Sequence, residues 1–299
     1  MAHQHSDKVS ENPSEKKLIA TMVLNFLITA VEIVGGIISG SLSLLSDAIH
    51  NFSDGIAIII SYAAVRLSRQ PRTPKHTFGL KRAEILAAVV NASTLIIISF
   101  FLIKEAIGRF SAPTHITGGL MLTVAAIGFA ANVVGTFLLK QGASGNINIR
   151  SAYLHLISDA ISSLAVVLGA VFIMILDITW IDPVLTILIS LYILKETYDI
   201  VRESVGVIMM ATPGEIDVRE LQEAIEAISG VRNIHHLHIW RLNDADIHFE
   251  AHIEVDDVPV SKTAEIRSHI QQYLHDRFYI SHTTLQFECD SCSRKELVA

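Results

Sequence analysis

Residues 44–60 read LLSDAIHNFSDGIAIII, and residues 153–167 read YLHLISDAISSLAVV. Each stretch is apolar enough for a membrane helix, yet each contains a histidine followed four residues later by an aspartate. The pairs are His50 with Asp54 and His155 with Asp159. Because residues four apart lie on one face of a helix, each pair presents an imidazole beside a carboxylate. These two stretches therefore predict the fold class together with its chemistry.

The apolar character extends outward from these stretches over most of the chain. The 299 residues are 51% hydrophobic and 18% charged, whereas ordinary globular proteins have about 25% charged residues. A helix that crosses a bilayer needs about 20 predominantly apolar residues. Such segments lie at residues 18–38, 44–65, 85–107, 117–139, 152–176 and, less cleanly, 181–200. We therefore expect an α-helical membrane protein with six transmembrane helices within residues 18–210.

The parts of the chain outside these helices differ in character. Residues 1–17 are polar, lack the apolar core of a signal peptide and are expected to be disordered. Residues 211–290 predict a soluble domain, and residues 291–299 are expected to form a flexible tail. Lys and Arg residues concentrate before the first helix, between the second and third helices, and around the loop between the fourth and fifth. By the positive-inside rule, both termini are expected to lie in the cytoplasm.

Aspartates inside a membrane helix are costly, at roughly 2.5–3.5 kcal/mol each on insertion scales. If the two helices face each other, the two His/Asp pairs supply two nitrogen and two carboxylate ligands, a set suited to tetrahedral Zn²⁺. The two carboxylates also balance the charge of a dication. The alternative is that these residues only hydrogen-bond the helices together. The matched spacing favours the metal site.

Proton coupling follows from the same residues. Without metal, two carboxylates in a low dielectric repel each other, so the empty site takes up protons and metal binding releases them. A site that binds either Zn²⁺ or H⁺ and opens alternately to the two sides is a proton-coupled antiporter. The sequence leaves open the roles of Asp47, one turn from His50, and of Glu32 in the first helix.

Motifs along the chain resemble those of the cation diffusion facilitator family, zinc-exporting type. They are Ser46-Asp47-Ala48-x-His50-x-x-x-Asp54, Phe78-Gly79-x-x-Arg82-x-Glu84, His155-x-x-x-Asp159 and His235-His236-Leu237-His238-Ile239-Trp240. The resemblance covers residues 15–290 and implies a homodimer in the cell (inner) membrane that exports divalent metal from the cytoplasm in exchange for protons. In this family a histidine at the position of His50, in place of an aspartate, is associated with zinc rather than manganese. Cd²⁺, Co²⁺ and Ni²⁺ suit the same nitrogen and oxygen ligands.

The soluble domain predicts a small α+β fold. An amphipathic helix is expected at 215–229, strands at 231–242 and 247–255, a second helix at 262–278 and a third strand at 283–288. This α-β-β-α-β order is expected to form a ferredoxin-like domain with a metallochaperone-like topology.

Histidines are dense in this domain, which holds eight of the chain's 14. The family resemblance implies a cytoplasmic metal site at His235, His252 and Glu288, with His282 as a further candidate ligand. In a regular strand, His235 and its neighbour His236 point to opposite faces. A solvated, histidine-rich surface is the alternative that the sequence leaves open.

Cys289 and Cys292 follow the third strand as a lone C-x-x-C, which is only half of a structural zinc site. In a cytoplasmic tail both thiols are expected to be reduced. They either combine with His3 or His5 of the neighbouring subunit, as N-terminal ligands do in some relatives, or take no part in metal binding.

Other function classes fit the sequence less well. A membrane zinc sensor that binds metal without moving it would not need polar residues in two transmembrane helices. A membrane metalloprotease lacks its H-E-x-x-H motif here, so no enzyme activity is expected. A passive channel is disfavoured because four tight ligands stop an ion rather than let it pass. The net charge of −7 gives no reason to expect nucleic-acid binding.

Overall fold

The computed structural model describes residues 13–140, 147–243, 246–292 and 295–298, and the chain divides into two compact units. The first unit comprises residues 1–60 and 90–199, and the second comprises residues 61–89 and 200–299. Long helices make up the first unit, whereas the second contains a small sheet with its own apolar core.

Within the described part of residues 13–208, the chain forms a succession of long helices. They are α1 (Pro13–Ser39), α2 (Leu42–Ser68), α3 (Ala83–Ser111), α4 (Gly118–Lys140), α5 (Ile147–Leu176) and α6 (Ile181–Ile208). Because α1 begins at Pro13, residues 13–17 are helical rather than disordered as expected. Proline suits the first helical position because its missing N–H would have no partner there.

Among the described residues, five helices are long and apolar enough to cross a membrane: α1 to α5. Helix α6 has 28 residues, but Lys195, Glu196 and Asp199 interrupt its second half. The sixth predicted segment therefore exists as a helix, and its apolar stretch is shorter than that of the other five.

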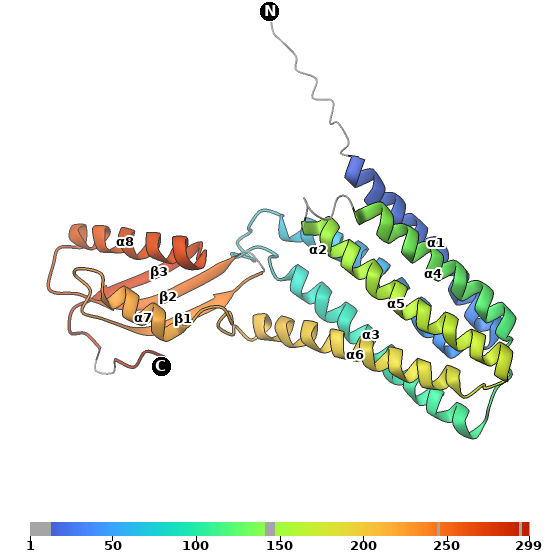
Figure 1. The fold of residues 1–299 in the computed structure, drawn as a ribbon. Helices are drawn as coiled ribbons and strands as arrows, with labels where there is room; N and C mark the ends of the chain where they lie inside the picture. The colour runs from blue at the N-terminus through green and yellow to red at the C-terminus, as the bar shows by residue number, and fades with distance from the viewer. Residues whose placement is uncertain (1–12, 141–146, 244–245, 293–294, 299) are drawn as a thin grey trace, which may run out of the picture. The chain divides into compact units, whose positions relative to one another are not determined.

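Small and polar side chains are buried between these helices together with a cluster of apolar ones that includes Leu44 and Met121. Helix α4 packs against α1 and α5, and the three run side by side (Figure 1). Gly35 of α1 lies so close to α4 that an added Cβ would be 2.7 Å from a methyl group of Val124. Large apolar side chains such as Ile97, Phe101 and Phe137 are exposed instead. This arrangement suits a bundle surrounded by lipid, where small residues let helices approach closely.

The C-terminal domain has the predicted order of elements. They are α7 (Val218–Glu226), β1 (Asn233–Arg241), β2 (Ile247–Glu254), α8 (Val260–Phe278) and β3 (His282–Glu288). The sheet order is β1-β2-β3, with β1 antiparallel and β3 parallel to the central strand β2. Asp217 caps α7 by accepting hydrogen bonds from the backbone N–H groups of Arg219 and Glu220.

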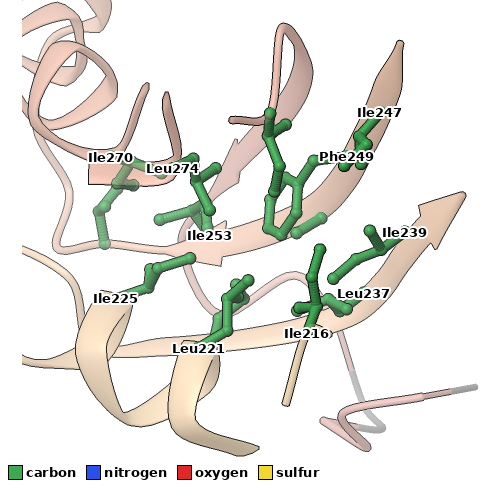
Figure 2. Close-up of a cluster of buried hydrophobic side chains, with 14 residues drawn as sticks. Ile216, Leu221, Ile225, Leu237, Ile239, Ile247, Phe249, Ile253, Ile270 and Leu274 are labelled. Carbon is green, nitrogen blue, oxygen red and sulfur yellow. The ribbon is translucent and has the colours of Figure 1, made fainter. Parts of the chain in front are cut away.

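Both helices of this domain bury apolar side chains against the sheet (Figure 2). Leu221 comes from α7, Ile270 and Leu274 come from α8, and Phe249 and Ile253 come from the central strand. All five are at most 1% exposed. This continuous core is what fixes the three strands, and with them the histidines that they carry.

The end of the chain is attached to this domain. We name residues 289–292 and 295–298 the C-terminal segment. The backbone N–H of Leu237 donates to the carbonyl oxygen of Leu297 at 2.8 Å, and that of His236 donates to Glu296 at 3.2 Å. Leu297 also packs against the apolar core. The described residues of the tail, expected to be flexible, therefore make specific contacts with β1.

Candidate metal centres

The helices α2 and α5 bring the two predicted His/Asp pairs together. The Nε2 atom of His155 lies 3.4 Å from Oδ2 of Asp54 and 3.5 Å from Oδ2 of Asp159. The Nε2 atom of His50 lies 3.5 Å from the same Asp54 oxygen. The rings of the two histidines are 6.3 Å apart, centre to centre. These contacts therefore link the four side chains in the order His50, Asp54, His155, Asp159 between the two helices.

The carboxylates of this cluster lack compensating donors. Within the described residues, both oxygens of Asp159 and Oδ2 of Asp54 are buried and accept no hydrogen bond. Asp159 is only 1% exposed, whereas the side chain of His155 is 42% exposed. Unpaired carboxylate oxygens in a buried place are costly unless a cation or protons neutralise them. This is the donor set and charge that a divalent cation fits.

A cavity of about 420 Å³ adjoins the cluster. Side chains from α1, α2, α4 and α5 line it, including both Asp54 and His155. Thr21, Asn25 and Asn51 add polar groups to walls that are otherwise mostly apolar. The exposed side of the cluster therefore opens onto a space large enough to admit a hydrated ion.

Asp47 lies outside the cluster, one turn before His50. Its two carboxylate oxygens accept hydrogen bonds from Ser162 at 2.5 Å and from Ser163 at 2.8 Å. Asn132 of α4 donates in turn to the hydroxyl oxygen of Ser163 at 3.2 Å. Asp47 therefore ties α2 to α5 and, through Ser163, to α4.

Glu32 of α1 is 1% exposed, and its carboxyl group lies over Gly128 of α4, where an added Cβ would collide with it. The sequence left the roles of Asp47 and Glu32 open, and neither residue is among the four side chains of the two His/Asp pairs.

Asp182, at the start of α6, holds the beginning of α2, a role that was not predicted from the sequence. It is completely buried and accepts hydrogen bonds from the hydroxyls of Ser41 (2.6 Å) and Ser43 (2.7 Å). It also accepts hydrogen bonds from the backbone N–H groups of Leu42 (2.9 Å) and Ser43 (3.1 Å). These are the donors that a helix start leaves unpaired. Arg109 of α3 lies 3.6 Å away and balances the charge.

The C-terminal domain brings together three of the four residues predicted there. Nε2 of His235 lies 2.7 Å from Oε1 of Glu288, and Nδ1 of His252 lies 3.3 Å from Oε2. The sulfur of Cys292 lies 3.7 Å from Nδ1 of His252 and 3.5 Å from Glu288. One ligand atom from each of these four residues lies within 4.8 Å of every other.

Strand pairing positions this cluster. His235 of β1 is directly opposite His252 of β2 in the sheet. The register shifts between His235 and His238, and His236 adopts a positive φ of 49°. This bulge breaks the strict alternation expected from the sequence, so the rings of His235 and His236 are only 5.5 Å apart. His235 is fully buried.

His282 lies elsewhere in the sheet. The parallel register pairs it with His248, whereas Gln286 is opposite His252. The rings of His248 and His282 are 4.5 Å apart. Burial, and then the nearby His282, lower the pKa of His248. The other predicted partners of Cys292, His3 and His5, lie outside the residues that the structure describes.

Comparison with known proteins now identifies the family. The family described as "Cation efflux transmembrane domain" matches residues 18–209, and "Cation efflux protein, cytoplasmic domain" matches residues 213–289. The chain belongs to the cation efflux family. This confirms the resemblance to the cation diffusion facilitator family.

Curated relatives match this cation efflux protein over nearly its whole length. Zinc transporter ZitB of Shigella flexneri is 36% identical, covering 99% of this chain and 95% of the relative. The "Cadmium, cobalt and zinc/H(+)-K(+) antiporter" of Bacillus velezensis is 36% identical, covering 96% and 92%. "Metal cation efflux system protein CzcD" of Cupriavidus metallidurans is 34% identical, covering 98% and 92%.

One solved structure, described as the metal-bound C-terminal domain of the CzcD transporter of Cupriavidus metallidurans, matches part of this cation efflux protein. It is 34% identical, covers 24% of this chain and 99% of the solved chain, and has a TM-score of 0.23.

The charges around the C-terminal cluster of this cation efflux protein favour a cation. Burial raises the pKa of Glu288, but the hydrogen bond from Cys292 and the neighbouring His235 and His252 lower it more, so the net shift is downward. The hydrogen bond to Glu288 raises the pKa of the Cys292 thiol, and burial raises it further. Two imidazoles, a carboxylate and a thiol thus converge with few other partners, which is a donor set that fits Zn²⁺.

Proposed function

We propose that this protein is a proton-coupled antiporter that exports Zn²⁺ from the cytoplasm. The observation that carries the proposal is the convergence of two His/Asp pairs from α2 and α5 in an apolar helical bundle. The transport ligands are His50, Asp54, His155 and Asp159. The names of the relatives, which include zinc, cadmium and cobalt as substrates, support this set of ions. Ni²⁺ suits the same ligands.

The counter-ion in this proposal is H⁺. When the site holds Zn²⁺, the two carboxylates neutralise it, and when the site is empty, protons replace the metal on the same groups. Alternate exposure of the site to the two sides then exchanges one ion for the other. The name of the Bacillus relative includes H⁺ as an exchanged ion, which supports this coupling.

The proposal extends to topology and assembly. Helix α6 is the sixth transmembrane helix, both termini lie in the cytoplasm, and the protein resides in the cell (inner) membrane. The C-terminal domain has a ferredoxin-like fold, for which the α-β-β-α-β order and the mixed three-stranded sheet are the support. The protein forms a homodimer, and the match of residues 213–289 to a domain of other cation efflux proteins supports a shared assembly.

The C-terminal domain in this proposal senses cytoplasmic zinc through His235, His252 and Glu288, whose ligand atoms are close enough to share one ion. His282 is not included because it pairs with His248 at another position in the sheet. Metal bound between the strands can shift the equilibrium between the transporter's two conformations, which expose the site to opposite sides of the membrane. The size of the shift is set by how much more tightly one conformation binds the metal than the other.

The test is zinc flux into proteoliposomes under an imposed pH gradient. The wild type is expected to accumulate zinc, and Asp159→Ala is expected to accumulate none. Asp177→Asn is the matched control because it removes a carboxylate at the exposed end of α5, at a positive φ that asparagine tolerates. Wild-type flux in Asp159→Ala would contradict the site. Zinc binding without flux in the wild type would favour a membrane zinc sensor instead.

A further inference from the structure

The C-terminal segment returns to the sheet beside the metal cluster of the C-terminal domain. Two backbone hydrogen bonds join Glu296 and Leu297 to the bulged part of β1. The ammonium group of Lys295 lies 2.6 Å from Oε1 of Glu254, at the end of β2. The segment is therefore anchored beyond Cys292 to two different strands of the sheet.

This path brings one of the two cysteines to the cluster. The sulfur of Cys292 lies 3.5 Å from Glu288 and 3.7 Å from His252. Cys289 is exposed, and its sulfur is not among the converging ligand atoms. The two thiols of the C-x-x-C are thus unequal, although they are only three residues apart.

The distances suit a single ion. In a tetrahedral zinc site with bonds of about 2.0–2.3 Å, neighbouring ligand atoms are roughly 3.3–3.8 Å apart. Here the separations that involve His252, Glu288 and Cys292 are 3.3, 3.5 and 3.7 Å. The fourth ligand atom, from His235, lies 2.7 Å from the other carboxylate oxygen of Glu288, Oε1, and all four residues offer ligand atoms within 4.8 Å of one another.

We propose that Cys292 is the fourth ligand of the cytoplasmic metal site, and that the bound metal fastens the C-terminal segment across the sheet as a latch. The proposal rests on the cytoplasmic metal site of the proposed function and is independent of transport. A donor set of two nitrogens, one oxygen and one sulfur selects Zn²⁺, Cd²⁺ and Co²⁺ over Mn²⁺ and Mg²⁺, which prefer oxygen ligands alone.

Other candidates for the fourth ligand fit less well. His282 is four residues from Gln286, the residue opposite His252. The ring of His236 is stacked on that of His252, at 4.9 Å and 27°. An imidazole binds metal through an in-plane nitrogen lone pair, and stacking aligns the faces of the rings instead. Cys292 is the residue whose ligand atom lies with the other three.

The first test uses Co²⁺ titration of the full-length protein in detergent. A thiolate bound to Co²⁺ gives a sulfur-to-cobalt charge-transfer band in the near ultraviolet, and the proposed transport site contains no sulfur. The wild type and Cys289→Ser are expected to show the band, and Cys292→Ser is expected to lose it. The proposal is overturned by a band that persists in Cys292→Ser, by a band lost in Cys289→Ser, or by no band in the wild type.

The second test examines the latch by amide hydrogen exchange with and without Zn²⁺. Exchange at Leu237 and in residues 295–298 is expected to slow with metal in the wild type and in Cys289→Ser, but not in Cys292→Ser. Leu297→Ala keeps every ligand, weakens the anchor and should lower Zn²⁺ affinity of this site about tenfold, as supporting residues around metal sites do. If amide hydrogen exchange in the C-terminal segment of the wild type is the same with and without Zn²⁺, the proposed latch is contradicted.

Zinc flux in the same preparations separates the two proposals. A charge-transfer band without zinc flux would support Cys292 as a ligand and contradict the proposed transport function. Zinc flux without a charge-transfer band would support the transport function and contradict the assignment of Cys292 as a ligand.

Discussion

In the helical unit, Ile97 and Phe101 are exposed while Ser43 and Asp159 are buried; in the C-terminal domain, Phe249 is buried and most charged side chains lie outside. The difference follows from the solvent that each unit is built for. Lipid accepts large apolar side chains, so helices in a bilayer associate through small and polar groups. Water excludes apolar side chains, so the C-terminal domain gathers them in a core (Figure 2).

The two candidate metal sites differ in the same way. The membrane site takes its ligands from two helices, as pairs four residues apart, and lies where unpaired charge is most costly. The cytoplasmic site takes its ligands from three strands and a returning segment, above a conventional core. In the proposed function, the first therefore depends on a bound cation or protons for its charge balance, whereas the fold that carries the second has its own apolar core.

The largest expected effect comes from removing one shared carboxylate of the membrane site. Asp54 lies within 3.5 Å of both histidines, so Asp54→Asn should abolish zinc flux in proteoliposomes. Asp47→Asn is the comparison, because Asp47 is hydrogen-bonded to serines outside the cluster and an amide keeps part of that network. We expect Asp47→Asn to retain measurable flux. An equal loss of zinc flux in the two variants would contradict the assignment of the two His/Asp pairs as the transport ligands.

The next prediction compares a buried apolar residue of the C-terminal domain with an exposed apolar residue of the helical unit. Leu221→Ala, in the core of the C-terminal domain, should lower the free energy of unfolding of that domain by about 2–5 kcal/mol. Ile97→Ala, at an exposed position of α3, should change the thermal stability of the detergent-solubilised protein little. Thermal unfolding followed by circular dichroism measures both. A large loss in Ile97→Ala would mean that this face of α3 is covered by protein.

A smaller effect is expected on selectivity. His50→Asp replaces a borderline-soft nitrogen with a hard oxygen and adds a negative charge to the membrane site. The ratio of Zn²⁺ to Mn²⁺ flux should fall on the order of tenfold, about 1.4 kcal/mol. Competition between the two ions in one flux assay measures this ratio. An unchanged ratio would remove His50 from the ligand set.

The smallest effect is expected from the cytoplasmic site. Replacing His235, His252 and Glu288 together by Ala should weaken transport or shift its zinc dependence by about fivefold, at the low end of common coupling energies of 1–3 kcal/mol. Flux measured over a range of zinc concentrations, with circular dichroism to verify folding, tests this. If a folded variant matches the wild type at every concentration, the sensor role is untenable.

The proximity of the two His/Asp pairs could be predicted from the sequence because the geometry within each pair is local. A spacing of four residues in a helix fixes which side chains share a face, and charged residues in apolar segments are conspicuous. The same reasoning could not find Asp182, because its partners Ser41 and Ser43 lie more than 130 residues away in the chain. Only the fold brings α6 to the start of α2.

The C-terminal site was predictable in part. The family resemblance pointed to His235, His252 and Glu288, which the sheet places together. The sequence named His282 as a further candidate and did not place Cys292 beside these three residues, because their proximity depends on the parallel register of β3 and on the return of the segment after it. The bulge at His236 also breaks the alternation on which strand predictions rely. Long-range pairing, rather than local spacing, decides this site.

The most direct test of antiport is to record zinc and pH inside the same vesicles. With zinc added outside and the membrane potential held at zero, zinc entry through the wild type should make the interior more alkaline as protons leave. Reversing the zinc gradient should reverse the pH change, and Asp159→Ala should show neither. Zinc entry with no pH change, or with acidification of the interior, would contradict a zinc/proton antiporter built on the two His/Asp pairs.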